Sequence, residues 1–186
     1  MLRRSSRLFQ ALSFAPRHEF GYFYNCLSGR TSVSITLDDT DRRILTMLQE
    51  DGSLTVNELA QRIGMTPPPC WRRVKRLKDA GCLRRQVWLV DAAAVGLEVT
   101  LYANIQLTAH DLEATTAFRE HVRALPEVIE CYLLLGNSDA LLKIIVPSIK
   151  YYETFFYTRL SQLPGVRAIT SSVVMTEIKA TTSLPV

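Results

Sequence analysis

The sequence contains few of the residues on which metal centres and covalent catalysis depend. Its four cysteines include no C-x-x-C pair, its three histidines show no H-E-x-x-H spacing, and its eight glycines form neither a G-x-G-x-x-G motif nor a P-loop. We therefore predict no catalytic residues, no metal ligands and no cofactor. Cys70, Cys82 and Cys131 lie among apolar positions, and we expect them to be small residues of the core.

Long apolar runs are also lacking. The longest, such as 140–146 and 87–90, are far shorter than the roughly 18 residues that a membrane-spanning helix needs. Of the 186 residues, 47% are hydrophobic and 22% are charged, which is typical of a globular chain with one large or two small domains. We expect a soluble, cytoplasmic protein with no membrane partner.

Acidic residues are nearly absent from the start of the chain. Residues 1–35 carry five arginines and a single glutamate, a composition that an organellar transit peptide also has. We favour a different interpretation, a disordered basic leader over residues 1–36, because every recognisable pattern begins at Leu37. Such a leader would also result from an upstream start codon.

The net charge of +4 is unevenly distributed. Residues 66–85 contain seven Lys or Arg and one Asp, whereas residues 91–186 contain seven Lys or Arg against ten Asp or Glu. A concentrated basic segment attracts polyanions. The pattern indicates a basic binding domain joined to a second, mildly acidic module.

Three short helices are predicted in the basic half. The first begins near Leu37, where apolar residues recur at helical spacing. The second has a capping box formed by Thr55 and Glu58 and ends at Gly64. The third begins at Pro67 after Thr66, a residue type that caps helices. Two helices joined by a short Gly-containing turn are typical of a helix-turn-helix, whose second helix enters the DNA major groove.

The third helix has one apolar and one cationic side. Its helical spacing places Cys70, Val74 and Leu77 on the first side and Arg72, Lys75 and Arg76 on the second. We expect these cations to read base edges, although a solvated charged face in another kind of helical domain remains an alternative. The segment Cys82–Val90 is predicted to be a wing strand whose arginines, with Lys78, contact phosphates. The residues expected to contact double-stranded DNA are Thr66, Trp71, Arg72, Arg73, Lys75, Arg76, Lys78, Arg84 and Arg85.

The C-terminal half has the pattern of a ferredoxin-like βαββαβ domain. The fold class is therefore α+β, with a winged helix-turn-helix domain over residues 37–90, a linker over 91–97, the ferredoxin-like domain over 98–180 and a tail over 181–186. One face of its sheet is left without a cover, so we expect association. The expected elements are strands at 99–107, 128–135, 140–146 and 166–178, and helices at 111–125 and 147–163.

Residues 37–186 closely resemble the Lrp/AsnC (feast/famine) family of prokaryotic transcriptional regulators. The resemblance is carried by LDDTDRRIL, by PPPCWRRVKRL, by GNSDALLKIIVP and by LPGVRAITSSVVMTEIKATTSLP, in that order. The leader has no counterpart in the family. The resemblance implies a nucleoid-associated regulator that forms dimers, which assemble into octamers, and that holds an amino-acid effector where two C-terminal domains meet.

The resemblance also implies which residues respond to the effector. Many relatives have Gly-Asp-aromatic-Asp in the turn between the second and third strands, whereas this chain has Gly136-Asn137-Ser138-Asp139. The identity of the effector, the target genes and the direction of regulation are left open. The positions that match the family's response residues are Leu133, Gly136, Asp139, Ser172, Val173 and Val174.

Two alternatives to an effector-responsive regulator are considered. The altered turn is compatible with an architectural DNA-binding protein that has no effector. Some proteins with a similar two-domain layout decarboxylate a tetrapyrrole with His and Arg side chains, and here the C-terminal half offers only His110 and His121. The cationic third helix, which such an enzyme does not need, favours a regulator.

Overall fold

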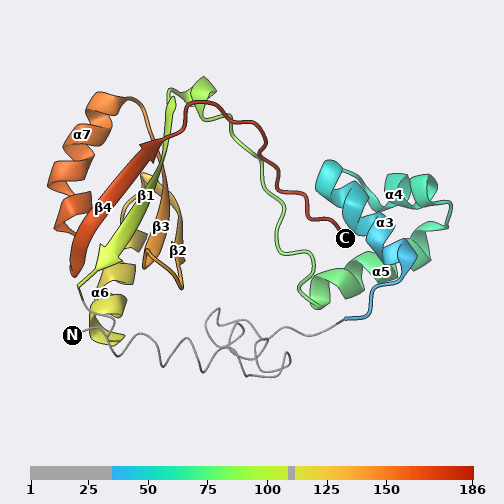
Figure 1. Ribbon diagram of the computed structural model, residues 1–186. Coiled ribbons are helices and arrows are strands. Elements are labelled where there is room, and N and C mark those ends of the chain that lie inside the picture. Colours follow the sequence, from blue (N-terminus) through green and yellow to red (C-terminus); the bar gives the residue numbers. More distant parts are fainter. Residues whose placement is uncertain (1–34, 109–111) are drawn as a thin grey trace. The chain divides into compact units, whose positions relative to one another are not determined.

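The computed structural model describes residues 35–108 and 112–186 and divides the chain into two compact units (Figure 1). We call the first the head domain; it comprises the described residues up to Gln86 together with Thr182–Val186. The second, Val87–Thr181, is called the sheet domain. The predicted leader lies outside the described residues except for its last two positions, and so does His110.

The head domain contains the three predicted helices, α3 (Asp39–Glu50), α4 (Val56–Ile63) and α5 (Pro67–Asp79). The capping box of Thr55 and Glu58 is present, and Gly64 ends α4 with a φ of 83°, in the left-handed region that favours glycine. A second capping box joins Asp38 and Asp41 at the start of α3. The helices pack around a small core of Ile44, Leu45, Leu59, Ala60, Ile63, Cys70, Val74 and Leu77.

Two sequence predictions for the head domain were wrong. Thr66 occupies the N-cap position of α5, but its side chain makes no capping hydrogen bond. Such a bond needs a backbone N–H at the second or third helical position, and Pro68 and Pro69, which lack an N–H, occupy both. The segment Cys82–Val90 forms no strand, because a strand needs a neighbouring strand and no described segment pairs with it.

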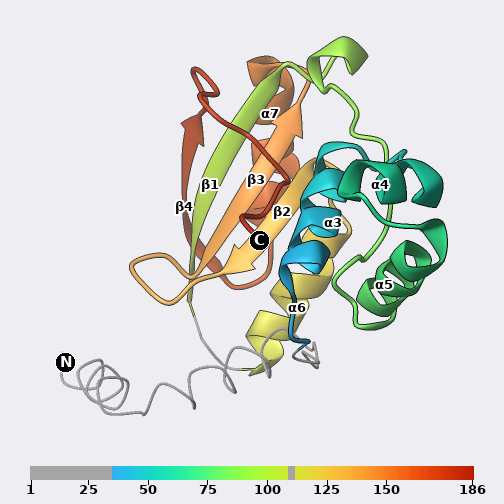
Figure 2. The ribbon, with the colours of Figure 1, turned by 90° about the vertical axis from the view of Figure 1, so that its right-hand side faces the viewer.

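The sheet domain has the predicted ferredoxin-like fold. Its antiparallel strands are arranged in the order β2-β3-β1-β4. Both helices cover one face of the sheet, and Figure 2 shows the other face. The elements are β1 (Val99–Leu107), α6 (Leu112–Arg123), β2 (Val128–Leu133), β3 (Ala140–Val146), α7 (Ile149–Thr158) and β4 (Val166–Val173), with short 3₁₀ turns at Ala93–Val95 and Leu160–Gln162.

The core of the sheet domain lies between the sheet and the two helices. Alternate residues of β3, namely Ala140, Leu142, Ile144 and Val146, are fully buried, and Phe118 of α6 packs in the same cluster. Such alternation is expected of a strand with one face in the core and the other toward solvent. The register of the strands is therefore set by burial.

Some predicted boundaries and burials of the sheet domain need correction. Strand β4 was predicted to reach residue 178 but ends at Val173, where its register with β1 ends at the Leu101–Val173 pair. One further backbone bond, from Val174 N–H to Thr100 O (2.9 Å), follows the strand. Strand β2 was predicted to reach residue 135 but ends at Leu133, which forms the last pair with β3, at Ala140. Leu134 N–H then donates to Asp139 O within the turn (2.9 Å). Of the three cysteines, only Cys70 is in the core; Cys82 in the head domain and Cys131 in β2 are exposed.

Candidate functional site

The solvent face of α5 presents the cationic groups that the sequence predicts. Arg72, Lys75 and Lys78 are exposed, and none of them takes part in an ion pair within the described part of the chain. Trp71 is half exposed, and Lys75 Nζ lies 5.3 Å from the centre of its ring. This cation–π contact limits the freedom of the lysine side chain without neutralising its charge. The face therefore combines unpaired positive charge with a half-exposed aromatic ring.

Arg73 and Arg76 are engaged differently, because they turn toward α3. Arg73 Nη1 lies 2.6 Å from Asp38 Oδ2 and 2.9 Å from Asp41 Oδ1. Arg76 Nη2 pairs with Asp41 Oδ2. The hydrogen bond between the Arg73 and Asp38 side chains raises the pKa of Arg73 and lowers the pKa of Asp38, so both groups are charged at neutral pH. The cations of α5 thus divide into an outward group and a group held by α3.

The pairing with α3 was not anticipated from the sequence. The L-D-x-x-D motif was interpreted only as acids in the first turn of a helix, where they favour the helix dipole. The available signal was the spacing on the two helices: Asp38 and Asp41 are three residues apart, and so are Arg73 and Arg76. Residues three apart lie on one helix face, so the two pairs can meet if those faces pack.

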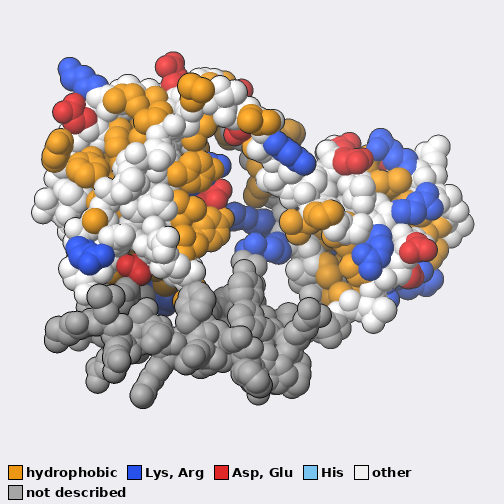
Figure 3. All heavy atoms as spheres, in the orientation of Figure 1, with side chains coloured by type: hydrophobic (Ala, Val, Ile, Leu, Met, Phe, Trp, Pro, Cys, Tyr) orange, Lys and Arg blue, Asp and Glu red, His pale blue; other side chains and the backbone are white. Residues whose placement is uncertain are grey.

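The segment that follows α5 is basic and extended. Arg84 and Arg85 are exposed, and the neighbouring Gln86 donates through Nε2 to Gly52 O (2.6 Å). With Lys78 these arginines border a hollow of about 490 Å³ whose other lining is mainly apolar, including Leu54. Figure 3 shows Lys and Arg side chains, in blue, at several places on the head domain. The basic surface therefore includes both α5 and the residues just after it.

The positions matched to effector response lie at two opposite ends of the sheet. Leu133 pairs with Ala140, which pairs with Ile105 near one end of β1. Val173 pairs with Leu101, near the other end of the same strand. Four residues along a strand span about 13 Å. Within one chain, the turn at Gly136 and the end of β4 therefore do not form one cluster.

Asp139 is tied to the neighbouring strand. Its carboxylate Oδ2 accepts from the backbone N–H of Leu107 (2.7 Å), and its own N–H donates to Ile105 O (2.9 Å). Hydrogen bonds to a charged group are stronger than neutral ones. The turn is thus anchored on β1 through the residue that the sequence singled out for effector binding.

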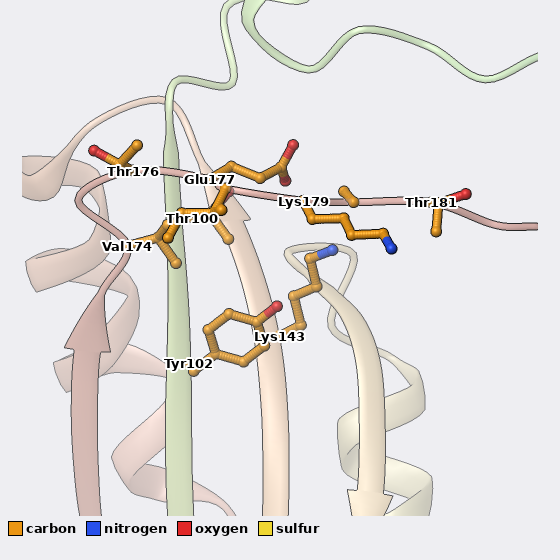
Figure 4. A pocket seen from close by; sticks show the side chains of 10 residues that line it. Thr100, Tyr102, Lys143, Val174, Thr176, Glu177, Lys179 and Thr181 are labelled. Carbon is orange, nitrogen blue, oxygen red and sulfur yellow. The ribbon is translucent and has the colours of Figure 1, made fainter.

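Val174, which follows β4, borders a hollow of about 710 Å³ on the helix-free face of the sheet. Figure 4 shows Tyr102 and Lys143 projecting from the sheet toward the stretch that carries Glu177 and Lys179. Lys143 Nζ lies 3.6 Å from Glu130 Oε1. This end of the sheet therefore brings together side chains of both charge signs.

Two negative findings concern the described residues alone. None of their helices is long and apolar enough to cross a membrane. Their His, Cys, Asp and Glu side chains form no group of three that would hold a metal ion. His121 is exposed on α6, where its Nδ1 lies 2.8 Å from Ala117 O of the same helix.

Comparisons with known proteins agree with this architecture. Residues 37–84 match the model for a winged helix-turn-helix DNA-binding domain, and residues 100–184 match the model for the Lrp/AsnC ligand binding domain. The chain is 37% identical to the transcriptional regulator AzlB of Bacillus subtilis (strain 168) over 83% of this chain and 98% of that protein. It is also 37% identical to the DNA-binding transcriptional activator DecR of Escherichia coli (strain K12), over 81% of this chain and 99% of that protein.

A solved structure extends the comparison to the fold. A transcriptional regulator from Neisseria meningitidis, solved as its complex with L-methionine, shares 39% identity and superposes with a TM-score of 0.77. The match covers 81% of this chain and 97% of that one. AzlB and DecR are both transcriptional regulators. The chain belongs to the Lrp/AsnC family and is a DNA-binding transcriptional regulator.

Proposed function

We propose that the protein recognises specific DNA sites through the outward face of α5, with Arg72 and Lys75 reading base edges. The observation that carries the proposal is the division of the α5 cations, which leaves these two exposed and outside the described ion pairs. Arg76 is held by Asp41, so we assign it a supporting role. Lys78 in the last turn of α5, together with Arg84 and Arg85 just after the helix, is suited to phosphates, which orient a protein on DNA without specifying sequence.

We further propose that two copies act together, with higher assembly up to an octamer. The extended segment Val87–Val90 supports association, because its four apolar side chains are exposed and its backbone pairs with no described strand. The helix-free face of the sheet also exposes Tyr102 and Tyr132. A symmetric pair of head domains would require a nearly palindromic site. Because the proposed role is binding to DNA sites, we expect the protein to act in the cytoplasm, on the nucleoid.

An amino acid is the effector class that we propose. The Neisseria relative was solved with L-methionine, and the matched domain model is a ligand binding domain. Because Gly136 and Val173 lie at opposite ends of one sheet, an effector that uses both groups would need residues from two copies. Binding would then depend on assembly, and by linkage assembly would depend on the effector.

Selection of DNA sites by the purified protein tests the proposal. Fragments recovered from a random pool should share a nearly palindromic motif, and one amino acid from the common set should change both the affinity for that motif and the assembly size measured by light scattering. Recovery of no common motif would contradict sequence-specific recognition. A motif without any response to the amino acids would instead favour the architectural alternative.

The effector site itself is tested at Asp139. If its carboxylate binds an amino-acid ammonium group, Asp139→Asn should abolish the effector's influence while changing effector-free DNA affinity by less than about threefold. If Asp139 serves only to anchor the turn on Leu107, effector affinity measured by isothermal titration should stay unchanged. Glu153→Gln, at an exposed position of α7, is the matched variant because it also removes one carboxylate charge, away from both groups of proposed effector residues.

A further inference from the structure

We propose that Asp41 is a positioning residue for DNA recognition: it sets the rotation of α5 about its own axis and withdraws Arg73 and Arg76 from phosphate contacts. The proposal rests on the assignment of α5 as the DNA-reading helix. Asp41 itself lies on α3 and touches no part of the exposed face formed by Arg72 and Lys75.

The burial of Asp41 is the first observation. Its side chain is fully buried on the core side of α3, near Ile44 and Leu45, and it is the one buried charged residue in the part of the chain that the structure describes. Burying a carboxylate is unfavourable unless it is paired and hydrogen-bonded. Both of its oxygens meet this condition, because Oδ1 pairs with Arg73, and Oδ2 pairs with Arg76 and accepts from the N–H of Asp38 (3.2 Å).

The directionality of these contacts is the second observation. Arg73 and Arg76 are three residues apart on α5, so one carboxylate binds two successive turns of the helix. The apolar contacts of Cys70, Val74 and Leu77 are not directional and tolerate small rotations of α5. A rotation would, however, break one of the two ion pairs. The network therefore sets the direction in which the outward side chains point, and base readout depends on displacements of roughly 0.5 Å.

Charge neutralisation has a separate consequence. Non-specific DNA binding is almost wholly electrostatic, and each phosphate contact adds about 0.9 to the slope of log affinity against log salt. With Arg73 and Arg76 paired to acids, fewer cations are available to bind any DNA sequence. Removal of the Asp41 charge should therefore raise non-specific affinity and lower specific affinity. Loss of folding would lower both affinities, so it cannot produce these two changes together.

Binding of Asp41→Asn to a selected site and to a scrambled site over a range of salt concentrations tests this inference. We expect the ratio of specific to non-specific affinity to fall by about tenfold, while non-specific affinity rises and its salt slope becomes steeper by about one. The matched control is Asp39→Asn, which removes the same charge from an exposed position in the first turn of α3 and should leave the ratio within about twofold. An unchanged ratio in Asp41→Asn, or an equal fall in Asp39→Asn, would overturn the proposal.

Arg73→Gln keeps the inference testable should Asp41→Asn fail to fold. Arg73 is partly exposed and directed at α3, so its loss leaves the outward face intact. The ratio of specific to non-specific DNA affinity should also fall by about tenfold in Arg73→Gln, with little change in non-specific affinity. An unchanged ratio would contradict a positioning role. If the unmodified protein shows no preference between the two DNA sites, it is the assignment of α5 as a reading helix that fails, and not the role of Asp41.

Discussion

The two domains are stabilised by different kinds of contact. The head domain has a core of eight buried hydrophobic residues with a fully buried carboxylate at its edge, whereas the sheet domain packs thirteen buried hydrophobic residues and has no fully buried charged residue among those described. Apolar packing tolerates many orientations, while ion pairs require particular ones. The orientation of α5, which we propose reads DNA, therefore depends on charged contacts, whereas the framework of the sheet domain depends on apolar packing.

The largest effect is expected from truncation in the larger core. Phe118 is fully buried between α6 and the sheet. Phe118→Ala should lower the free energy of unfolding of the sheet domain by about 3–5 kcal/mol, because it removes a large apolar side chain and leaves a cavity. Chemical denaturation followed through the amide NMR signals of β3 measures this change. Signals of α4 should keep their midpoint, and an equal loss at α4 would show that the two domains unfold as one unit.

Two threonines at helix starts in the head domain differ in whether their side chains cap the helix. Thr55 accepts from the N–H of Glu58, so Thr55→Ala should cost about 1 kcal/mol of unfolding free energy. Thr66 makes no capping bond, and Thr66→Ala should cost less than about 0.5 kcal/mol. Denaturation midpoints of the two variants provide the measurement. Equal losses would mean that the threonine before the three prolines stabilises α5 by another route.

The smallest effect expected is a difference in pH dependence. In the head domain, hydrogen bonds lower the pKa of Asp38, Asp51 and Glu58 below their ordinary values of 3.8 to 4.5. Lowered pKa values stabilise the fold above the ordinary pKa, and this contribution is lost as the pH falls through the folded-state pKa. The head domain should therefore lose stability below about pH 4.5.

The sheet domain should respond at the opposite end of the pH range. A hydrogen bond to Glu130 raises the pKa of Tyr132 above its ordinary 10.0, and one to Glu127 does the same for Tyr151. A raised pKa stabilises the fold below the ordinary value, and the contribution is lost as the pH rises through the folded-state pKa. Thermal melting of α4 and β3 signals at several pH values tests both directions. Melting of β3 before α4 in acid would contradict the comparison.

Local patterns explain which features could be predicted from the sequence. The apolar spacing of α4 and α5, the capping box at Thr55 and the strand at 140–146 each depend on neighbours in sequence, and all were predicted correctly. The wing strand was not, because pairing requires a partner segment that sequence spacing does not reveal.

Contacts between distant residues limited the prediction of the site. The exposure of Arg72 and Lys75 follows from helical spacing alone. The ion pairs of Asp41 with Arg73 and Arg76 join positions more than 30 residues apart, and they depend on how α3 packs on α5. The separation of Gly136 from Val173 likewise depends on the antiparallel register of β1 with its two neighbours.

The affinity of Arg72→Gln for a selected DNA site and for a scrambled one tests most directly the claim that the outward face of α5 reads sequence. Loss of a base contact should reduce discrimination by about 1–3 kcal/mol, whereas Arg85→Gln should weaken binding to both sites equally and reduce the salt slope by about one. If Arg72→Gln weakens both sites equally, or if Arg85→Gln loses discrimination to the same extent, α5 is not the helix that reads the DNA.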